Sequence, residues 1–356
     1  MQYVKTIWVL SITVLICTGW IALEKGLEPP KPVKLIVPKG WPSPVYDFSK
    51  NPLTEAGIEL GRQLFYDEQL SKDGTISCGS CHQQFGAFNS YDHPLSHGIN
   101  NQLTTRNAPG LFNLAWQKEL MWDGAILHLD QQPLAPITAE NEMGETIENV
   151  LIKLRNNPAY KKMFKASFGD ETINTQRFGK ALSQFLLTMI SSNSKYDKVQ
   201  KGEDRFNASE QVGYGIFKTK CAQCHAEPLF TDYTYRNNGV ELDPYLKDLG
   251  RMAITGNAAD SLKFKVPSLR NVQVSFPYAH DGRFFSLMNV FEHYRNNMQP
   301  GPTTDPLLKN KIPLSNFEIG QLRAFLYTLT DSMFLKDPKF AAPTAVITNI
   351  PPLDSH

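Results

Sequence analysis

The strongest constraint on this chain is a five-residue motif that occurs twice, as CGSCH at residues 78–82 and as CAQCH at residues 221–225. Two thiols separated by two residues can bond to both vinyl groups of one haem, and the adjacent histidine can then ligate the iron. Paired cysteines also serve thiol exchange and zinc binding, but neither function requires a histidine directly after the second cysteine. The repeat predicts two covalent c-type haems, attached to Cys78, Cys81, Cys221 and Cys224 and ligated by His82 and His225.

The composition limits the remaining function classes. A chain of 356 residues can hold two domains of ordinary size, each with its own core. The net charge of +1 argues against nucleic acid as a partner. Four of the five cysteines lie in the two motifs, which leaves only Cys17 and excludes a disulfide framework.

The N-terminus predicts export to the periplasm. An apolar run from Ile7 to Leu23 follows Lys5 and is typical of a secretory signal or a membrane anchor. No small-residue cleavage pattern precedes Glu24, which favours an uncleaved anchor in the inner membrane. Six prolines between residues 29 and 44 then predict a stiff, extended tether.

Sequence blocks repeat in the same order in both halves of the chain. The matched blocks are residues 61–65 and 213–217 before the motifs, and residues 109–124 and 267–282 after them. Pro109 precedes Trp122 by the same number of residues as Pro267 precedes His280, so Trp122 and His280 occupy equivalent places. This matched spacing predicts a mainly α-helical protein of two cytochrome c-like haem domains related by internal duplication.

Two further helices are expected from apolar periodicity and capping. Residues 174–194 carry helical apolar spacing at Phe178, Leu182, Phe185, Leu186 and Met189. Ser315 and Glu318 form a capping box that opens a last helix. The expected organisation is a signal or anchor at 1–26, a Pro-rich linker at 27–50, an N-terminal haem domain at 51–200, a C-terminal haem domain at 201–340 and a tail at 341–356.

The haem motifs, the WDG block at 122–124, the PYAHDG block at 277–282 and the run at 264–271 together resemble the bacterial di-haem cytochrome c peroxidase and MauG-like family. The similarity covers residues 51–335. It implies that the haem on His82 reacts with hydrogen peroxide and that the haem on His225 passes electrons to it. It also implies a small cytochrome c or cupredoxin as electron donor, and it leaves a homodimer open.

The resemblance assigns three catalytic residues. Glu142 and Gln132 match the family's distal pair, with Glu142 as the acid–base group and Gln132 as the hydrogen-bonding partner. Cleaving an O–O bond requires such a proton carrier and a donor to the departing hydroxide. Alternatively, both are solvated loop residues. Trp122 matches a tryptophan between the haems that relays an electron, a role compatible with packing in the core.

The iron ligands depart from the commonest pattern of the peroxidases. A distal histidine caps the first haem in many of them, but the register here places Ile99 at that position, with His97 and His93 nearby. We therefore expect a first haem whose iron has an open coordination position without prior reduction. His97 could replace the missing ligand, or it could simply be an exposed, solvated residue. At the second haem the register places Tyr294 at the far-side ligand position, as in the MauG-like branch, with Met298 as the alternative and His293 third.

Two more features of the family can be compared with this chain. The MauG-like branch oxidises a protein substrate through a surface tryptophan before the second motif, yet residues 217–220 contain none, although Tyr214 could serve. The family also holds a calcium ion between its domains. The matching positions are Asn107, through its side chain, and Ser275 and Pro277, through their carbonyl oxygens. Alternatively, Asn107 only stabilises the turn in which it lies.

These observations predict a cytochrome c peroxidase that reduces hydrogen peroxide to water with electrons from a small periplasmic redox protein. A MauG-like oxidase that modifies a protein or organic substrate is the alternative, favoured by Tyr294 and opposed by the missing surface tryptophan. A non-enzymatic di-haem electron carrier is a second alternative, which Gln132 and Glu142 oppose.

Overall fold

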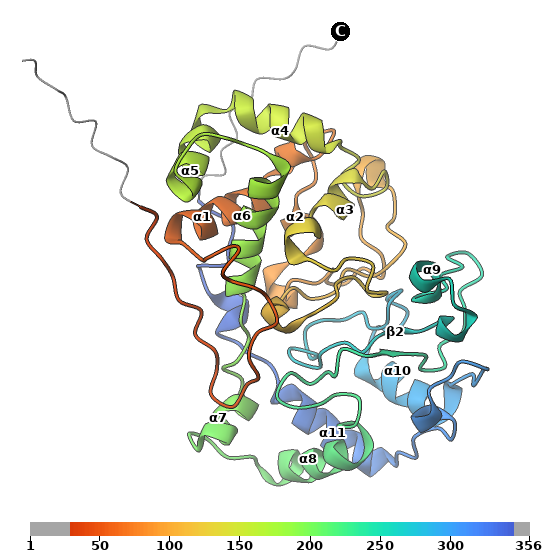
Figure 1. The fold of residues 1–356 in the computed structure, drawn as a ribbon. Coiled ribbons are helices and arrows are strands. Elements are labelled where there is room, and N and C mark those ends of the chain that lie inside the picture. Colours follow the sequence, from red (N-terminus) through yellow and green to blue (C-terminus); the bar gives the residue numbers. More distant parts are fainter. Residues whose placement is uncertain (1–28, 345–356) are drawn as a thin grey trace, which may run out of the picture.

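The computed structural model describes residues 29–344, and these residues are mainly helical (Figure 1). A single two-stranded antiparallel sheet in them pairs β1 (Tyr235–Arg236) with β2 (Phe264–Lys265). The prediction of a mainly α-helical protein is confirmed. No helix in residues 29–344 is long and apolar enough to cross a membrane, and the expected signal or anchor lies outside the described residues.

The helices fall into two groups that follow the order of the chain. Figure 1 shows the first group in the upper part of the view and the second in the lower part. The first group comprises α1 (Glu55–Tyr66), α2 (Cys78–Cys81), α3 (Leu134–Thr138), α4 (Ile147–Asn156), α5 (Pro158–Phe168) and α6 (Thr175–Thr188). The second comprises α7 (Lys195–Lys201), α8 (Ala208–Lys220), α9 (Met252–Thr255), α10 (Leu287–Glu292) and α11 (Asn316–Tyr327).

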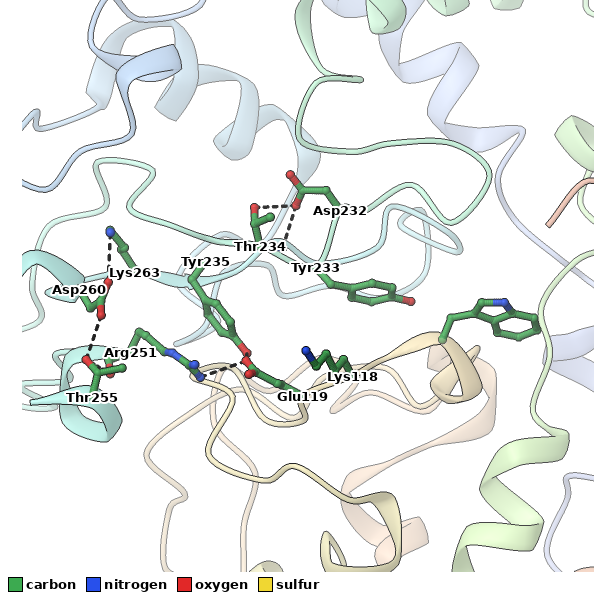
Figure 2. A pocket seen from close by; sticks show the side chains of 11 residues that line it. Lys118, Glu119, Asp232, Tyr233, Thr234, Tyr235, Arg251, Thr255, Asp260 and Lys263 are labelled. Atoms are coloured by element: carbon green, nitrogen blue, oxygen red, sulfur yellow. Dashed lines mark hydrogen bonds and ion pairs between the residues drawn. The ribbon is translucent and has the colours of Figure 1, made fainter. Parts of the chain in front are cut away.

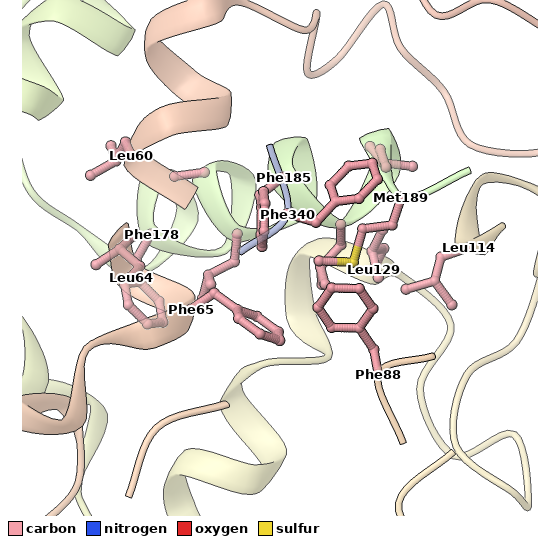
Figure 3. Packing of buried hydrophobic residues seen from close by; sticks show 14 of the residues in the cluster. Leu60, Leu64, Phe65, Phe88, Leu114, Leu129, Phe178, Phe185, Met189 and Phe340 are labelled. Atoms are coloured by element: carbon pink, nitrogen blue, oxygen red, sulfur yellow. The ribbon is translucent and has the colours of Figure 1, made fainter. Parts of the chain in front are cut away.

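The core of the N-terminal half forms where α1 crosses α6 (Figure 3). The predicted apolar stripe of α6 is buried, with Phe178 and Phe185 fully inaccessible to solvent. Asn174 caps this helix by accepting a hydrogen bond from the backbone of Arg177. At the crossing point Gly61 lies so close to α6 that a β-carbon there would sit 2.0 Å from the carbonyl oxygen of Ala181. Glycine therefore allows the two backbones to touch.

The C-terminal half repeats this arrangement with α8 and α11. Ser315 and Glu318 form the predicted capping box at the start of α11, which confirms that prediction. Phe217 on α8 and Phe325 on α11 are fully buried, with ring centroids 5.1 Å apart. A β-carbon at Gly213 would lie 2.0 Å from the carbonyl oxygen of Gln321, so this crossing also depends on a glycine.

The turns after the two haem motifs also match. Asn113 and Asn271 both adopt left-handed backbone angles with φ of 57°, a conformation that asparagine tolerates well. The backbone N–H of Asn113 donates to Met189 at 2.8 Å, and that of Asn271 donates to Leu329 at 3.0 Å. In each half the asparagine turn is therefore hydrogen-bonded to the chain just after a core helix, α6 in the first half and α11 in the second.

Both ends of the described chain pack on the N-terminal half. Side chains between residues 33 and 48, within the segment expected to be a linker, cover its core. Trp41 from this arm meets Trp116 edge to face, with ring centroids 4.9 Å apart. At the other end, Phe334 and Phe340 are buried in the same core, although the sequence placed them in the C-terminal domain. The N-terminal core is thus completed by residues from the end of the chain.

Candidate functional site

The first haem motif folds as the single helical turn α2. The side chain of Ser80 accepts a hydrogen bond from the backbone of Ser77 at 3.0 Å, which holds the start of the turn. Residues three apart in a helix lie on one face, so the turn presents Cys78 and Cys81 side by side. In the described chain, all four motif cysteines are free thiols. They are therefore available for thioether bonds.

The histidine of each motif is held by a backbone carbonyl. The Nδ1 of His82 lies 2.7 Å from the carbonyl oxygen of Phe88. The Nδ1 of His225 lies 3.2 Å from that of Phe230 and 3.1 Å from that of Pro267. A hydrogen bond at Nδ1 fixes the tautomer that leaves Nε2 free as a ligand.

Burial keeps both imidazoles in the ligating form. It lowers the pKa of His82 and of His225, which favours the neutral ring. Each motif therefore offers two free thiols and one neutral, oriented imidazole. This donor set fits a covalently attached haem at each site, with His82 and His225 as iron ligands.

Glu142 lies near the thiols of the first motif. Burial raises its pKa, which favours the protonated carboxyl. Burial also raises the pKa of the Cys78 thiol to about 12 and raises that of Cys81, and the negative charge of Glu142 adds to both effects. The carboxyl group is therefore close enough to the pair of thiols to act on chemistry at the haem that they would hold.

The loop expected to cap the first haem comes together with Glu142. The backbone N–H of Ile99 donates to the carbonyl oxygen of Glu142 at 2.8 Å. Ile99 is only 5% exposed, and its side chain packs against Gly144. His97 is exposed, with Nδ1 bonded to the side chain of Asn101 at 2.6 Å. The structure thus places an apolar side chain, rather than His97, beside the acid–base candidate.

Gln132 is tied to the turn that carries Trp122 rather than to Glu142. Its amide nitrogen lies 3.7 Å from the sulfur of Met121, the residue directly before Trp122. Within residues 29–344 no hydrogen bond joins the side chains of Gln132 and Glu142. A shared substrate would therefore have to lie between them for the two to act as a pair.

Trp122 lies at the contact between the two halves. Its indole N–H donates to the carbonyl oxygen of Asn107 at 2.8 Å. Its own carbonyl oxygen accepts from the backbone N–H of Lys265, on β2 of the C-terminal half, at 2.8 Å. Next to it, Arg106 bonds Asp123 in its own half and Asp248 in the other half, both at 2.6 Å. The tryptophan is therefore fixed in place from both sides.

Asn107, one of the residues expected to bind calcium, lies at the same contact. The backbone N–H of Asn107 donates to the carbonyl oxygen of His280 at 2.8 Å. Its side-chain amide donates to the carbonyl oxygen of Pro94 at 3.0 Å. Pro277 is buried and Ser275 is half-buried. Residues 29–344 contain no cluster of three or more His, Cys, Asp or Glu side chains that could hold a metal ion. A calcium site built mainly from carbonyl oxygens stays a prediction.

Tyr294 lies beside the second motif on a π-helical turn, His293–Asn297 (η7), that follows α10. Burial raises the pKa of its phenol, contact with Asn238 lowers it, and the charges of Cys221 and Cys224 raise it again. Single π-helical turns insert one residue into a helix and often occur at functional sites. The phenol therefore lies within electrostatic reach of both thiols that would hold the second haem.

Met298 and His293 are the alternative ligands of the second haem, and their side chains make different contacts. Met298 is only 2% exposed, and its side chain packs against Gly239. The Nε2 of His293 lies 3.0 Å from the carbonyl oxygen of Asn238, so this ring nitrogen is already engaged. The choice between Tyr294 and Met298 as the ligand of the second haem stays a prediction.

A cavity of about 630 Å³, lined mainly by residues with charged or hydroxyl groups, opens between the two halves (Figure 2). Glu119 lies on one wall and accepts from the Tyr235 hydroxyl at 2.6 Å and from Arg251 at 3.2 Å. Trp116 also lines the cavity. No sequence motif indicates this cavity, because its walls come from segments far apart in the chain.

Comparison with known proteins identifies the family. A profile described as "Di-haem cytochrome c peroxidase" matches residues 55–205. The methylamine utilization protein MauG of Methylophilus methylotrophus is 30% identical over 336 residues, covering 92% of this chain and 96% of that protein. The cytochrome c551 peroxidase of Nitrosomonas europaea is 33% identical over 322 residues, covering 89% and 87%.

A solved structure agrees with these relatives. It is a MauG-like protein associated with microbial copper homeostasis, 31% identical, with a TM-score of 0.76 and coverage of 87% of this chain and 99% of that one. Named peroxidases and MauG proteins thus match this chain at similar identity. The chain belongs to the di-haem cytochrome c peroxidase family.

Proposed function

We propose that this protein is a periplasmic di-haem peroxidase that reduces hydrogen peroxide to water with electrons from a small cytochrome c or cupredoxin. The single observation that carries the proposal is the position of Glu142, a half-buried carboxyl with a raised pKa beside the first pair of haem-binding thiols. A di-haem electron carrier would not need a titratable group there. Family membership supports the two haems and the peroxide substrate.

The residues of this chain supply proton transfer and orientation. The haem bound by Cys78, Cys81 and His82 would supply the redox chemistry. The ionised Glu142 takes a proton from one oxygen of hydrogen peroxide. It returns this proton to the other oxygen, which leaves as water. The amide of Gln132 donates a hydrogen bond to that leaving oxygen. The side chain of Ile99 excludes water from the same space, which strengthens both interactions.

Trp122 is proposed as the electron relay between the halves. An aromatic ring can carry an electron or a hole over distances too long for a single step between two irons. The hydrogen bond from its indole to Asn107 orients the ring, and the bond from the Lys265 backbone to its carbonyl oxygen fixes the residue against the other half. Replacement by Phe preserves most of the packing, so slower transfer without unfolding would support this role.

Three finer features belong to the same proposal. The matched glycine crossings and asparagine turns support an origin of the two halves by internal duplication. The hydrogen bond from the backbone of Asn107 to the carbonyl oxygen of His280, in the other half, supports a calcium ion that joins the halves. The apolar run 7–23 supports export, with either a cleaved signal or an inner-membrane anchor.

A MauG-like oxidase acting on a protein or organic substrate is the second candidate. The observation that favours it is Tyr294 near Cys221 and Cys224, because a phenolate ligand stabilises oxidised iron. The absence of tryptophan from residues 217–220 opposes the reaction of the MauG branch that uses a surface tryptophan.

The test of the proposal is the reaction of the holoprotein with peroxide in the Glu142→Gln variant. We expect the bimolecular rate to fall by roughly 100-fold or more, since a positioned acid–base group contributes at least that much. Glu140→Gln is the matched control, because Glu140 is an exposed carboxylate in the same loop. Equal rates in wild-type protein and both variants, measured by stopped-flow haem absorption, would contradict the proposal.

A further inference from the structure

Lys265 is the one lysine between residues 29 and 344 that is buried, with 8% of its surface exposed, and the proposed mechanism does not use its side chain. It lies on β2 of the C-terminal half, opposite Tyr235 of β1. Its ammonium makes no ion pair with any residue of that range, and it donates a hydrogen bond to the backbone carbonyl oxygen of Glu119, in the N-terminal half. A buried ammonium without a carboxylate partner is costly. Packing alone therefore does not explain the charge.

Lys265 bonds twice to the segment 119–122, which ends in Trp122. Its backbone N–H donates to the carbonyl oxygen of Trp122 at 2.8 Å, and its ammonium donates to that of Glu119. Between these two acceptors, Met121 has a left-handed backbone with φ of 65°, a conformation that is strained for a residue with a β-carbon. Strained backbone persists only where its surroundings fix it. The two bonds from Lys265 thus hold the segment from which the indole projects.

The charges around the ammonium leave it without a counter-ion of its own. Burial lowers the pKa of Lys265 to about 8, although the charges of Glu119 and Asp123 act in the opposite direction, and the charge of Arg251 adds to the lowering. Both carboxylates are engaged elsewhere. Glu119 accepts from the Tyr235 hydroxyl and from Arg251, and Asp123 pairs with an arginine of its own half at 2.6 Å. The ammonium is therefore charged at neutral pH and loses its proton in mildly alkaline solution.

The charge decides how firmly the side chain holds Glu119. A hydrogen bond from a charged donor is roughly twice as strong as one between neutral groups, so the ammonium holds the carbonyl more firmly than the amine would. Three neighbours of the ammonium, Glu119, Tyr235 and Arg251, line the cavity between the halves, which brings solvent to their far side (Figure 2). Loss of the proton of Lys265 to this solvent weakens the bond and frees the strained segment 119–122.

We propose that Lys265 is a positioning residue, whose ammonium holds the segment 119–122 and with it the Trp122 ring in the orientation that serves electron transfer between the halves. The inference rests on the proposed function, in which Trp122 relays electrons from the second haem to the first. Lys265 acts through the backbone of the segment and is itself neither oxidised nor reduced. The charged side chain keeps the segment fixed, and the neutral amine lets it loosen, so the transfer slows in alkaline solution.

The test is the rate of electron transfer between the haems of the half-reduced holoprotein, measured by pulse radiolysis between about pH 6 and 10. In the wild-type protein we expect the rate to fall severalfold as the pH rises past about 8. Lys265→Met fills a similar space without charge, so we expect the low rate at every pH. Lys263→Met is the matched control, because it removes an ammonium that pairs with Asp260 rather than with the segment 119–122, and it should keep the wild-type rate and pH profile.

Trp122→Phe separates the two ways in which the inference can fail. If Trp122→Phe slows the transfer but Lys265→Met keeps the wild-type rate and pH profile, the positioning role is wrong and the relay stands. If Trp122→Phe leaves the rate unchanged, the relay and its positioning are both wrong. Should Lys265→Met fail to fold, the wild-type profile decides the matter. A flat profile, or a rate that rises with pH because the charge acts on the ring directly, would overturn the positioning role.

Discussion

At the scale of single residues, the pKa of Glu142 has a consequence for pH dependence. The mechanism requires the ionised carboxylate, and burial raises the pKa of Glu142 above its ordinary value of 4.5. The rate of reaction with peroxide should therefore fall on acidification at a higher pH than a solvated glutamate would give. Stopped-flow rates between about pH 4 and 8 would measure this loss. The acidic loss should be missing from Glu142→Gln; its persistence there would assign it to another group.

The ligand of the second haem can be tested by two substitutions. Tyr294→Met should change the low-spin signal of that haem and raise its reduction potential, because a thioether ligand favours ferrous iron more than a phenolate does. Met298→Leu should leave both unchanged, since Tyr294 is the residue whose phenol pKa responds to Cys221 and Cys224. Electron paramagnetic resonance and a spectroelectrochemical titration would measure the two properties. The reverse pattern would assign the ligand to Met298.

Residues whose chemistry depends on local spacing could be predicted from the sequence. The two thiols and the histidine of each motif must lie within five residues, so their roles follow from the letters alone. The contact of Lys265 with Glu119 could not be found in this way. These residues lie in different halves of the molecule, and their contact depends on how β2 packs against the segment 119–122.

At the scale of the elements, the two helix crossings make a matched prediction. Gly61→Ala and Gly213→Ala should each lower the free energy of unfolding by about 1–3 kcal/mol, the usual cost of overpacking, because the new methyl group meets a carbonyl of the facing helix. Gly215→Ala is the control on the same helix as Gly213. It has open space at its β-carbon, so it should be neutral or stabilising by up to about 1 kcal/mol.

Denaturant unfolding of the holoprotein would measure these changes. Equal destabilisation by all three substitutions would mean that the close approach of the backbones is not what the glycines provide. A loss at Gly61 without a loss at Gly213 would show that the two crossings differ in energy despite their matched geometry.

Helix starts could be predicted better than helix irregularities. The capping signals at Asn174 and Ser315 are local, because the capping side chain bonds a backbone group within three residues. The π-helical turn that carries Tyr294 was not predicted. Such a turn depends on the tertiary surroundings of the inserted residue, here Asn238 and the second motif, and no periodic pattern indicates it.

At the scale of the whole molecule, Arg106 links the two halves. Its partners Asp123 and Asp248 are nearly buried, so removing the guanidinium leaves two carboxylates without compensation. Arg106→Met should lower the free energy of unfolding by about 3–5 kcal/mol, the usual cost of breaking a buried pair. Arg177→Met should cost about 0–1 kcal/mol, because its partner Asp170 is exposed.

The same variant should slow electron exchange between the haems, since Arg106 lies one residue before Asn107, which positions the Trp122 indole. Pulse radiolysis of the half-reduced protein would measure the exchange rate. An unchanged rate in a folded Arg106→Met protein would show that the ion pairs stabilise the contact without orienting the relay.

The repeated blocks contain the glycines of both helix crossings, Gly61 and Gly213, but the paths of the chain ends could not be predicted. Proline content predicted an extended arm before Asn51, and the arm is extended, yet its apolar side chains cover the N-terminal core. Whether an amphipathic arm projects into solvent or lies on a core depends on the surface that the remaining chain builds. That surface is built from residues far apart in the chain, so no local pattern in the sequence indicates it.

The return of Phe334 and Phe340 to the N-terminal core has a consequence for biogenesis. A chain that emerges from a translocon begins with its N-terminus, so the first CxxCH motif leaves long before the residues that close the core around it. Until Phe334 and Phe340 are exported, the side chain of Phe88 lacks these two apolar neighbours. The maturation machinery therefore has a period in which the first thiol pair is still open, and late closure would lock in a haem that has already been attached.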